Sequence, residues 1–191
     1  LLATPDWKLE HYEELGLNRP EPWQPGETLS AAIGQGFSSF TPLQMANYVA
    51  TIANGGTRYR PYLASEIIVG EDTVKESIQP QIIEELNLAP ETIAALKEGM
   101  HKVTEGEGTA AYYFLDFPIP VAGKTGTAQN PHGEDHAWFV AFAPYESPEI
   151  AIAVLIEKGG HGSSAAAPVG REILAAYFGL RKPDGAETTD D

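Results

Sequence analysis

Two apolar runs in the second half of the chain constrain its fold more than any other feature. HAWFVAFAPY (residues 136–145) and EIAIAVLIE (residues 149–157) are short and rich in aromatic and β-branched residues, and a turn around Glu146-Ser147-Pro148 separates them. This pattern predicts two antiparallel strands joined as a hairpin. Both alternating faces of each run are apolar, so we expect the sheet that holds them to be covered on both sides.

The length, composition and charge of the chain exclude several classes of protein. A chain of 191 residues, 42% hydrophobic and 20% charged, fits one soluble domain with a substantial core. The formal net charge of −15 argues against a nucleic-acid partner, because binding phosphate backbones requires clustered Lys and Arg. Cysteine is absent, which excludes disulfides and thiolate metal sites. The longest apolar run, IAIAVLI, is too short to cross a bilayer.

One helix has clear start and stop signals. Thr41 is a good N-cap, Pro42 fits the first helical position and Gln44 completes a capping box. Asn54-Gly55-Gly56 then supplies the positive φ angles that end a helix. The apolar residues at helical spacing between these signals predict one common face, formed by Leu43, Ala46, Val49, Ala50 and Ala53.

Other segments give weaker local signals. Residues 1–30 are expected to be irregular, with one short helix near Lys8–Leu15. Residues 57–80 are read as extended segments with a turn at Gly70-Glu71-Asp72, and a second helix follows from Pro90. A short helical turn is expected in TAAYYFL, residues 109–115.

The end of the chain divides into a helix and a tail. AAAPVGREILAAYFG, residues 165–179, predicts a closing helix. Its apolar stripe consists of Val169, Ile173, Ala176 and Tyr177. Residues 181–191 are acidic and polar and are expected to be disordered.

Three short motifs resemble known ligand-binding signatures, but the sequence does not support a ligand site at any of them. GKT in VAGKTGTAQ is not a phosphate loop, because Pro118 stands where that loop needs its first glycine. GQGFSS is not a dinucleotide fingerprint, because Ser39 stands at the third glycine. HGEDH is read as a solvated loop rather than a metal site, although it offers His132, Glu134, Asp135 and His136. No metal or cofactor is expected.

KTGT, residues 124–127, carries a coherent chemistry if it lies on a strand. Lys124 and Gly126 then point to one face, and Thr125 and Thr127 to the other. Lysine supplies a fixed cation, threonine hydroxyls bond a carboxylate, and glycine lets a substrate carbonyl approach the backbone. The backbone N–H after that glycine can donate to a developing oxyanion. An ordinary edge strand with a solubilising lysine stays open as the alternative.

An ordered series of motifs resembles the transpeptidase domain of penicillin-binding proteins, of the class B, penicillin-binding protein 2 type. The series runs W-x-PGET, IGQGF, TPLQMAN, ATIANGG, RPYL, GTA, GKTGTAQ, HAWFVAFAP and GGHGSSAAAP, from about Trp23 to Gly179. The resemblance implies an α+β fold, an antiparallel sheet flanked by helices. It implies a serine D,D-transpeptidase that crosslinks peptidoglycan stem peptides ending in D-Ala-D-Ala, and that β-lactam antibiotics trap as an acyl-enzyme.

The same resemblance assigns roles to the KTGT residues. Lys124 supplies positive potential, and Thr127 contributes an oxyanion-hole N–H. The hydroxyls of Thr125 and Thr127 hold the substrate carboxylate, beside Gly126. The resemblance also implies a location outside the cytoplasm, and we expect the full-length protein to be anchored by an N-terminal membrane helix upstream of these residues.

The chain departs from the family pattern in one respect. It contains neither S-x-x-K, which holds the nucleophile, nor S-x-N. We therefore expect residues 1–180 to be the C-terminal half of one domain, inactive alone, with the nucleophile and the first two strands upstream. Residues 149–157 would then present an unpaired edge to that missing half.

Two rival functions share parts of this sequence. A serine β-lactamase has the same KTG wall but hydrolyses its acyl-enzyme quickly. A non-catalytic homologue would act as a sensor or scaffold. The TPLQMA helix and the GGHGSS segment favour the transpeptidase over the lactamase.

Overall fold

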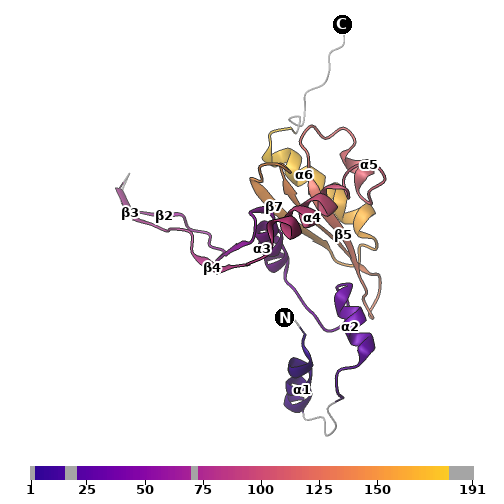
Figure 1. Cartoon of the computed structure of the whole chain (residues 1–191). Helices are drawn as coiled ribbons and strands as arrows, with labels where there is room; N and C mark the ends of the chain where they lie inside the picture. Colours follow the sequence, from indigo (N-terminus) through magenta and orange to yellow (C-terminus); the bar gives the residue numbers. More distant parts are fainter. Residues whose placement is uncertain (1–2, 16–20, 70–72, 181–191) are drawn as a thin grey trace.

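A three-stranded antiparallel sheet with helices on both faces forms the body of the molecule (Figure 1). The structure is a computed structural model that describes residues 3–15, 21–69 and 73–180. The strands lie in the order β5-β6-β7. They are β5 (Ala122–Ala128), β6 (His136–Ala143) and β7 (Ile150–Ile156). The hairpin expected from the two apolar runs is confirmed as β6 and β7, and so is the α+β class.

Each face of the sheet has its own hydrophobic core, as the apolar runs predicted. On one face lie α5 (Ala111–Phe114), the π-helical turn η1 (Gly162–Ala166) and α6 (Ala167–Tyr177), packed around the fully buried Phe139. The opposite face, visible in Figure 1, is covered by α3 (Pro42–Ala53) and α4 (Pro90–His101). The β6 strand is therefore buried from both sides, and it fixes the position of its neighbour β5.

The start and end of α3 follow the local sequence signals. Gln44 N–H donates to the Thr41 hydroxyl at 3.2 Å, and Thr41 N–H donates to the Gln44 side chain at 2.8 Å, which completes the capping box. Gly55 and Gly56 have φ angles of 91° and 116° and end the helix. The predicted apolar face is only half right, because Leu43 is 62% exposed. The buried residues lie at the C-terminal end of the helix: Val49, Thr51, Ile52 and Ala53.

Two helices occupy the N-terminal segment, where only one was expected. The expected helix is α1 (Pro5–Glu14), and the unexpected one is α2 (Pro25–Ala32). Lys8, 1% exposed, donates from Nζ to Glu27 Oε1 at 2.6 Å and so joins the two helices. That hydrogen bond raises the pKa of Lys8 and lowers the pKa of Glu27, each relative to its ordinary value.

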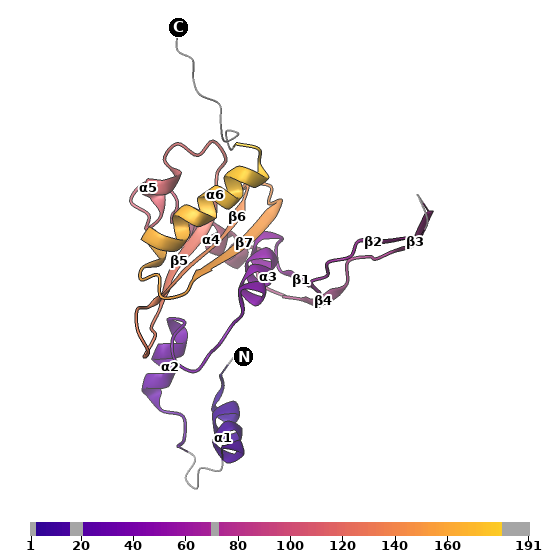
Figure 2. The same ribbon diagram turned by 180° about the vertical axis from the view of Figure 1, so that it is seen from behind.

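A two-stranded arm extends away from the body, as Figures 1 and 2 show. It consists of β1 (Thr57–Tyr59) paired with β4 (Ile82–Glu85), and β2 (Glu66–Val69) paired with β3 (Thr73–Ser77). The extended segments expected over residues 57–80 are confirmed, whereas β4 was not predicted. The expected turn at residues 70–72 lies outside the described residues.

The closing helix α6 forms as predicted, but its apolar stripe faces outward. Val169 and Ile173 are each 41% exposed and Tyr177 is 52% exposed, so the stripe is not part of the core. The buried side of α6 instead consists of small residues and one leucine, namely Ala167, Gly170, Leu174 and Ala175. The expected disordered tail, residues 181–191, lies outside the described residues.

Candidate active site

The KTGT residues lie in the middle of β5, at one edge of the sheet. Lys124 is opposite Val140 of β6, Thr125 is opposite Phe139, and Thr127 is opposite Ala137. Among the described residues, no strand pairs with the other edge of β5. KTGT therefore lies on an edge strand, so the strand geometry that its proposed chemistry requires is present.

The side chains of this strand alternate between the two faces, as expected. Thr125 and Thr127 lie on the face of α5 and α6, because their partners Phe139 and Ala137 belong to the core on that side. Lys124 lies on the face of α3 and α4, where its partner Val140 is buried. The strand thus offers a cation on one face and two hydroxyls on the other, and both reach the open edge.

Backbone groups of β5 also face this open edge. Lys124 Nζ donates to the Thr125 carbonyl at 2.7 Å, and Gln35 Nε2 donates to the Thr127 carbonyl at 3.0 Å. In an antiparallel strand the N–H and C=O of one residue point to the same side. The N–H of Thr127 therefore faces the open edge, which is the geometry that an oxyanion-hole donor requires.

The Gln35 side chain acts as a short substitute for a neighbouring strand. Besides its bond to Thr127, its Oε1 accepts from the backbone N–H of Gln129 at 3.4 Å. Gly34 and Gly36 flank it with φ angles of 78° and 85°, which only glycine adopts readily. The sequence around Gln35 resembles only an incomplete dinucleotide fingerprint and gives no signal for its contact with β5.

Thr109, in the segment between α4 and α5, makes a second contact with the strand, and no signal in the sequence indicates it. Thr109 Oγ1 lies 2.9 Å from Thr125 Oγ1, within hydrogen-bond distance. Thr109 is exposed and Thr125 is half-buried. The two hydroxyls meet at the same open edge of β5.

The η1 turn lies directly on the strand pair. An ideal Cβ on Gly162 would be 2.9 Å from the backbone nitrogen of Gly126, and closer still to the carbonyl oxygens of Gly126 and Trp138. The Gly162 N–H points to the Thr127 hydroxyl at 3.4 Å. The absence of a side chain at Gly162 therefore allows η1 to pack against KTGT.

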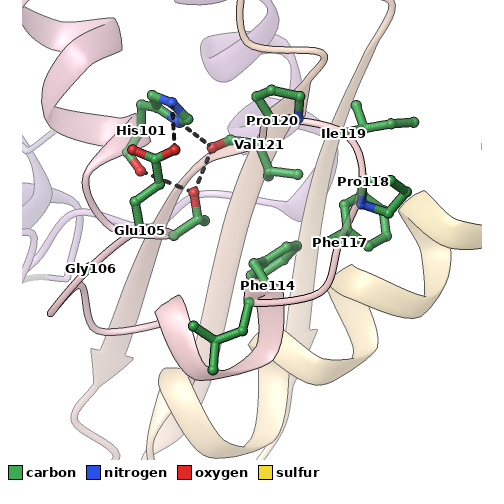
Figure 3. A pocket seen from close by; sticks show the side chains of 11 residues that line it. His101, Glu105, Gly106, Phe114, Phe117, Pro118, Ile119, Pro120 and Val121 are labelled. Atoms are coloured by element: carbon green, nitrogen blue, oxygen red, sulfur yellow. Dashed lines mark hydrogen bonds and ion pairs between the residues drawn. The ribbon is translucent and has the colours of Figure 1, made fainter.

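A cavity of about 450 Å³ lies at the N-terminal end of β5 (Figure 3). The Val121 carbonyl in its wall accepts two hydrogen bonds, from His101 Nδ1 at 2.8 Å and from the Thr104 hydroxyl at 2.5 Å. His101 Nε2 also lies 3.1 Å from Glu105. None of the predicted site residues lines this cavity, and its polar groups connect α4 to the start of β5.

Residues 132–135 of the HGEDH segment form a loop between β5 and β6, and His136 is the first residue of β6. Asp135 accepts from the backbone N–H of Asn130 at 3.3 Å, and His136 Nδ1 accepts from the backbone N–H of Lys158 at 3.1 Å. Within residues 3–15, 21–69 and 73–180, no group of three or more His, Cys, Asp or Glu side chains could hold a metal ion. The same residues contain no helix that is long and apolar enough to span a membrane.

Comparison with known families decides the relationship of this chain. The model of the penicillin-binding protein transpeptidase domain matches residues 10–175. The chain belongs to this family. It is 36% identical over 201 residues to the peptidoglycan D,D-transpeptidase MrdA of Haemophilus influenzae, with 95% of this chain and 29% of the relative covered. It is 39% identical to PbpA of Mycolicibacterium smegmatis, covering 76% and 31%.

Solved structures agree with this placement. PBP2 of Pseudomonas aeruginosa, in complex with WCK 5153, matches with a TM-score of 0.79 and 36% identity, over 98% of this chain and 39% of that one. The imipenem acyl-enzyme of penicillin-binding protein A from M. tuberculosis matches with a TM-score of 0.67 and 33% identity, covering 78% and 33%. The resemblance expected from the motifs is confirmed. The chain spans about a third of the length of these relatives.

Proposed function

We propose that residues 1–180 are the C-terminal part of a peptidoglycan D,D-transpeptidase domain. The observation that carries the proposal is the KTGT sequence on an open-edge strand of a chain that belongs to this family. The serine nucleophile comes from the part of the protein that the relatives contain and this chain does not. The intact protein crosslinks peptidoglycan stem peptides.

In the proposed reaction the serine attacks the penultimate D-Ala carbonyl of a stem peptide. The Thr127 N–H donates to the oxyanion that forms, and preorganised donors of this kind stabilise a transition state strongly. D-Ala leaves, and an amine from a second stem peptide attacks the acyl-enzyme to form the crosslink. The absence of a paired strand beside the Thr127 N–H, among the described residues, and the missing Cβ at Gly126 support this arrangement.

The terminal carboxylate of the stem peptide binds at the two hydroxyls of KTGT. Thr125 and Thr127 share a face of β5, and each can donate one hydroxyl proton to an anion. Lys124 adds positive potential from the other face, and it is exposed to solvent at the same edge. This placement of one cation and two hydroxyls suits a substrate with a free carboxyl group.

β-Lactam antibiotics are proposed to acylate the intact protein at the same serine. A relative with 33% identity forms an imipenem acyl-enzyme, and the same relative forms a penicillin G acyl-enzyme. β-Lactams carry a carboxylate beside a reactive amide, so they can use the same hydroxyls and the same oxyanion donor. A long-lived adduct distinguishes a transpeptidase from a serine β-lactamase, which releases the drug quickly.

The rest of the domain is proposed to dock along β7 and α6. Among the described residues β7 pairs only with β6, so its outer edge offers backbone groups to another strand. The exposed stripe of Val169, Ile173 and Tyr177 adds an apolar surface on the neighbouring helix. The intact protein is proposed to act outside the cytoplasm, anchored to the membrane by its N-terminal part.

Labelling with fluorescent penicillin tests this proposal on the intact protein. We expect a stable covalent adduct on the wild type. The Lys124→Ala variant should lose labelling by about 10²-fold, the scale on which site electrostatics act, whereas Lys75→Ala in the arm should leave it unchanged. The 191-residue chain alone should not be labelled, because it lacks the nucleophile. Rapid release of the drug would indicate a β-lactamase, and failure to label would indicate a non-catalytic homologue.

A further inference from the structure

Thr109 contacts a KTGT side chain but has no role in the reaction proposed above. Its hydroxyl lies 2.9 Å from that of Thr125, although it comes from a different element. The main chain on both sides of Thr109 is fixed. Gly108 N–H donates to the Glu105 carbonyl at 2.8 Å, and Ala110 N–H donates to the Val103 carbonyl at 2.9 Å.

Packing also holds the main chain around Thr109 in place. Ala110 is fully buried in the core beneath α5. The backbone of Gly108 lies against the carbonyl groups of Lys102 and Val103, with no room for a Cβ. The position of the Thr109 hydroxyl is therefore set by the end of α4 and the start of α5. The hydroxyl is exposed at the open edge of β5 even though its neighbours in sequence are anchored.

Proton counting fixes the direction of the hydrogen bond when an anion is bound. A threonine hydroxyl has one proton to donate and two lone pairs to accept with. If Thr125 donates its proton to a carboxylate, the proton between Thr125 and Thr109 must come from Thr109. The result is a chain in which Thr109 donates to Thr125 and Thr125 donates to the anion. Each bond in such a chain polarises and strengthens the next.

We propose that Thr109 is a positioning residue for the substrate carboxylate, acting through Thr125. This inference rests on the proposed function, because it assumes that Thr125 binds the carboxyl group of a stem peptide or a β-lactam. Thr109 selects the rotamer in which the Thr125 proton points into the open edge. It also makes Thr125 a stronger donor. The residue thereby favours acyl donors with a free carboxylate over neutral ones.

The test compares two probes on the intact protein, penicillin G and its uncharged methyl ester. The second-order rate constant of acylation is measured for the wild type, Thr109→Val, Thr109→Ser and the control Thr92→Val, an exposed threonine on α4. We expect Thr109→Val to lower the acylation rate constant for penicillin G by about fivefold, which corresponds to the loss of one net hydrogen bond. The methyl ester should react at the wild-type rate. Thr109→Ser, which keeps the hydroxyl, and Thr92→Val should both behave as the wild type does.

A second comparison isolates the route through Thr125. In a Thr125→Val background, Thr109→Val should not lower the acylation rate constant for penicillin G any further, because the hydroxyl of Thr125 through which Thr109 acts is absent. Equal slowing of both probes would overturn the inference, since a folding defect lowers the two rates together. An unchanged rate with penicillin G, or a further loss in the Thr125→Val background, would also overturn it. If the wild type reacts with neither probe, the proposed function fails, and this inference fails with it.

Discussion

Replacing Gly162 with alanine is expected to destabilise the intact protein and to disturb the KTGT strand. The added methyl group would meet the backbone nitrogen of Gly126 at 2.9 Å and would overlap the carbonyl oxygens of Gly126 and Trp138. Because all three atoms belong to the main chains of β5 and β6, no side chain can rotate away, and η1 itself must lift. Overpacking of this kind costs about 1–3 kcal/mol, and the rigid surroundings place this case at about 2–3 kcal/mol.

Urea unfolding of the intact protein measures that loss, and Gly99→Ala is the matched control. Gly99 lies in α4 with nothing within 4 Å of an added Cβ, so alanine there should stabilise by about 0.5–1 kcal/mol. Lifting η1 also breaks the contact from Gly162 to Thr127, so penicillin labelling of Gly162→Ala should slow. Equal unfolding midpoints for Gly162→Ala and the wild type would refute the packing of η1 on β5 described above.

Three further substitutions test other contacts. Thr104→Val removes the buried hydroxyl that donates to the Val121 carbonyl, and it should lower the free energy of unfolding by about 1–2 kcal/mol, whereas Thr104→Ser should not. Gln35→Ala and Gln35→Glu both lose the donor to the Thr127 carbonyl, so penicillin labelling should slow in each, whereas Gln79→Ala in the arm should label normally. Lys8→Met should return the lowered pKa of Glu27 toward its ordinary 4.5, as a carboxyl NMR titration can measure. Because that pKa is lowered in the folded protein, the Lys8–Glu27 pair stabilises the folded state above pH 4.5. This stabilisation is lost as the pH falls through the lowered pKa of Glu27.

Features with local causes could be predicted from the sequence. The capping box of Thr41 and Gln44 joins residues three apart, so it depends on no other part of the fold. The β6–β7 hairpin carries its own turn and its own apolar faces. The alternation of KTGT side chains between two faces is also a local property, because it depends only on the strand geometry of four consecutive residues. In α2 the local signal existed, a capping box between Gln24 and Glu27, but the Pro and Gly between them suggested irregular structure.

Contacts between distant segments could not be predicted in this way. Gln35 and Thr127 are 92 positions apart, and Thr109 and Thr125 are 16 apart, so no local pattern links them. The α6 stripe shows a different limit. Its spacing is amphipathic, but Ile173 is 41% exposed, because helical spacing identifies an apolar stripe without identifying the surface that the stripe contacts. β4 was missed because its partner β1 is distant in sequence and IIEE is short.

The order of the strands has a consequence for how any further strand can join this sheet. The open edge of β5 and the outer edge of β7 are two strand spacings apart, about 10 Å, and continuous backbone ladders join them. A strand added to β7 can shift only in whole-residue steps of about 3.4 Å, and a single step turns its inward side chains outward. A strand that pairs with β7 must therefore take one of a few discrete registers, and only the registers that keep its apolar side chains inward fit a sheet covered on both faces.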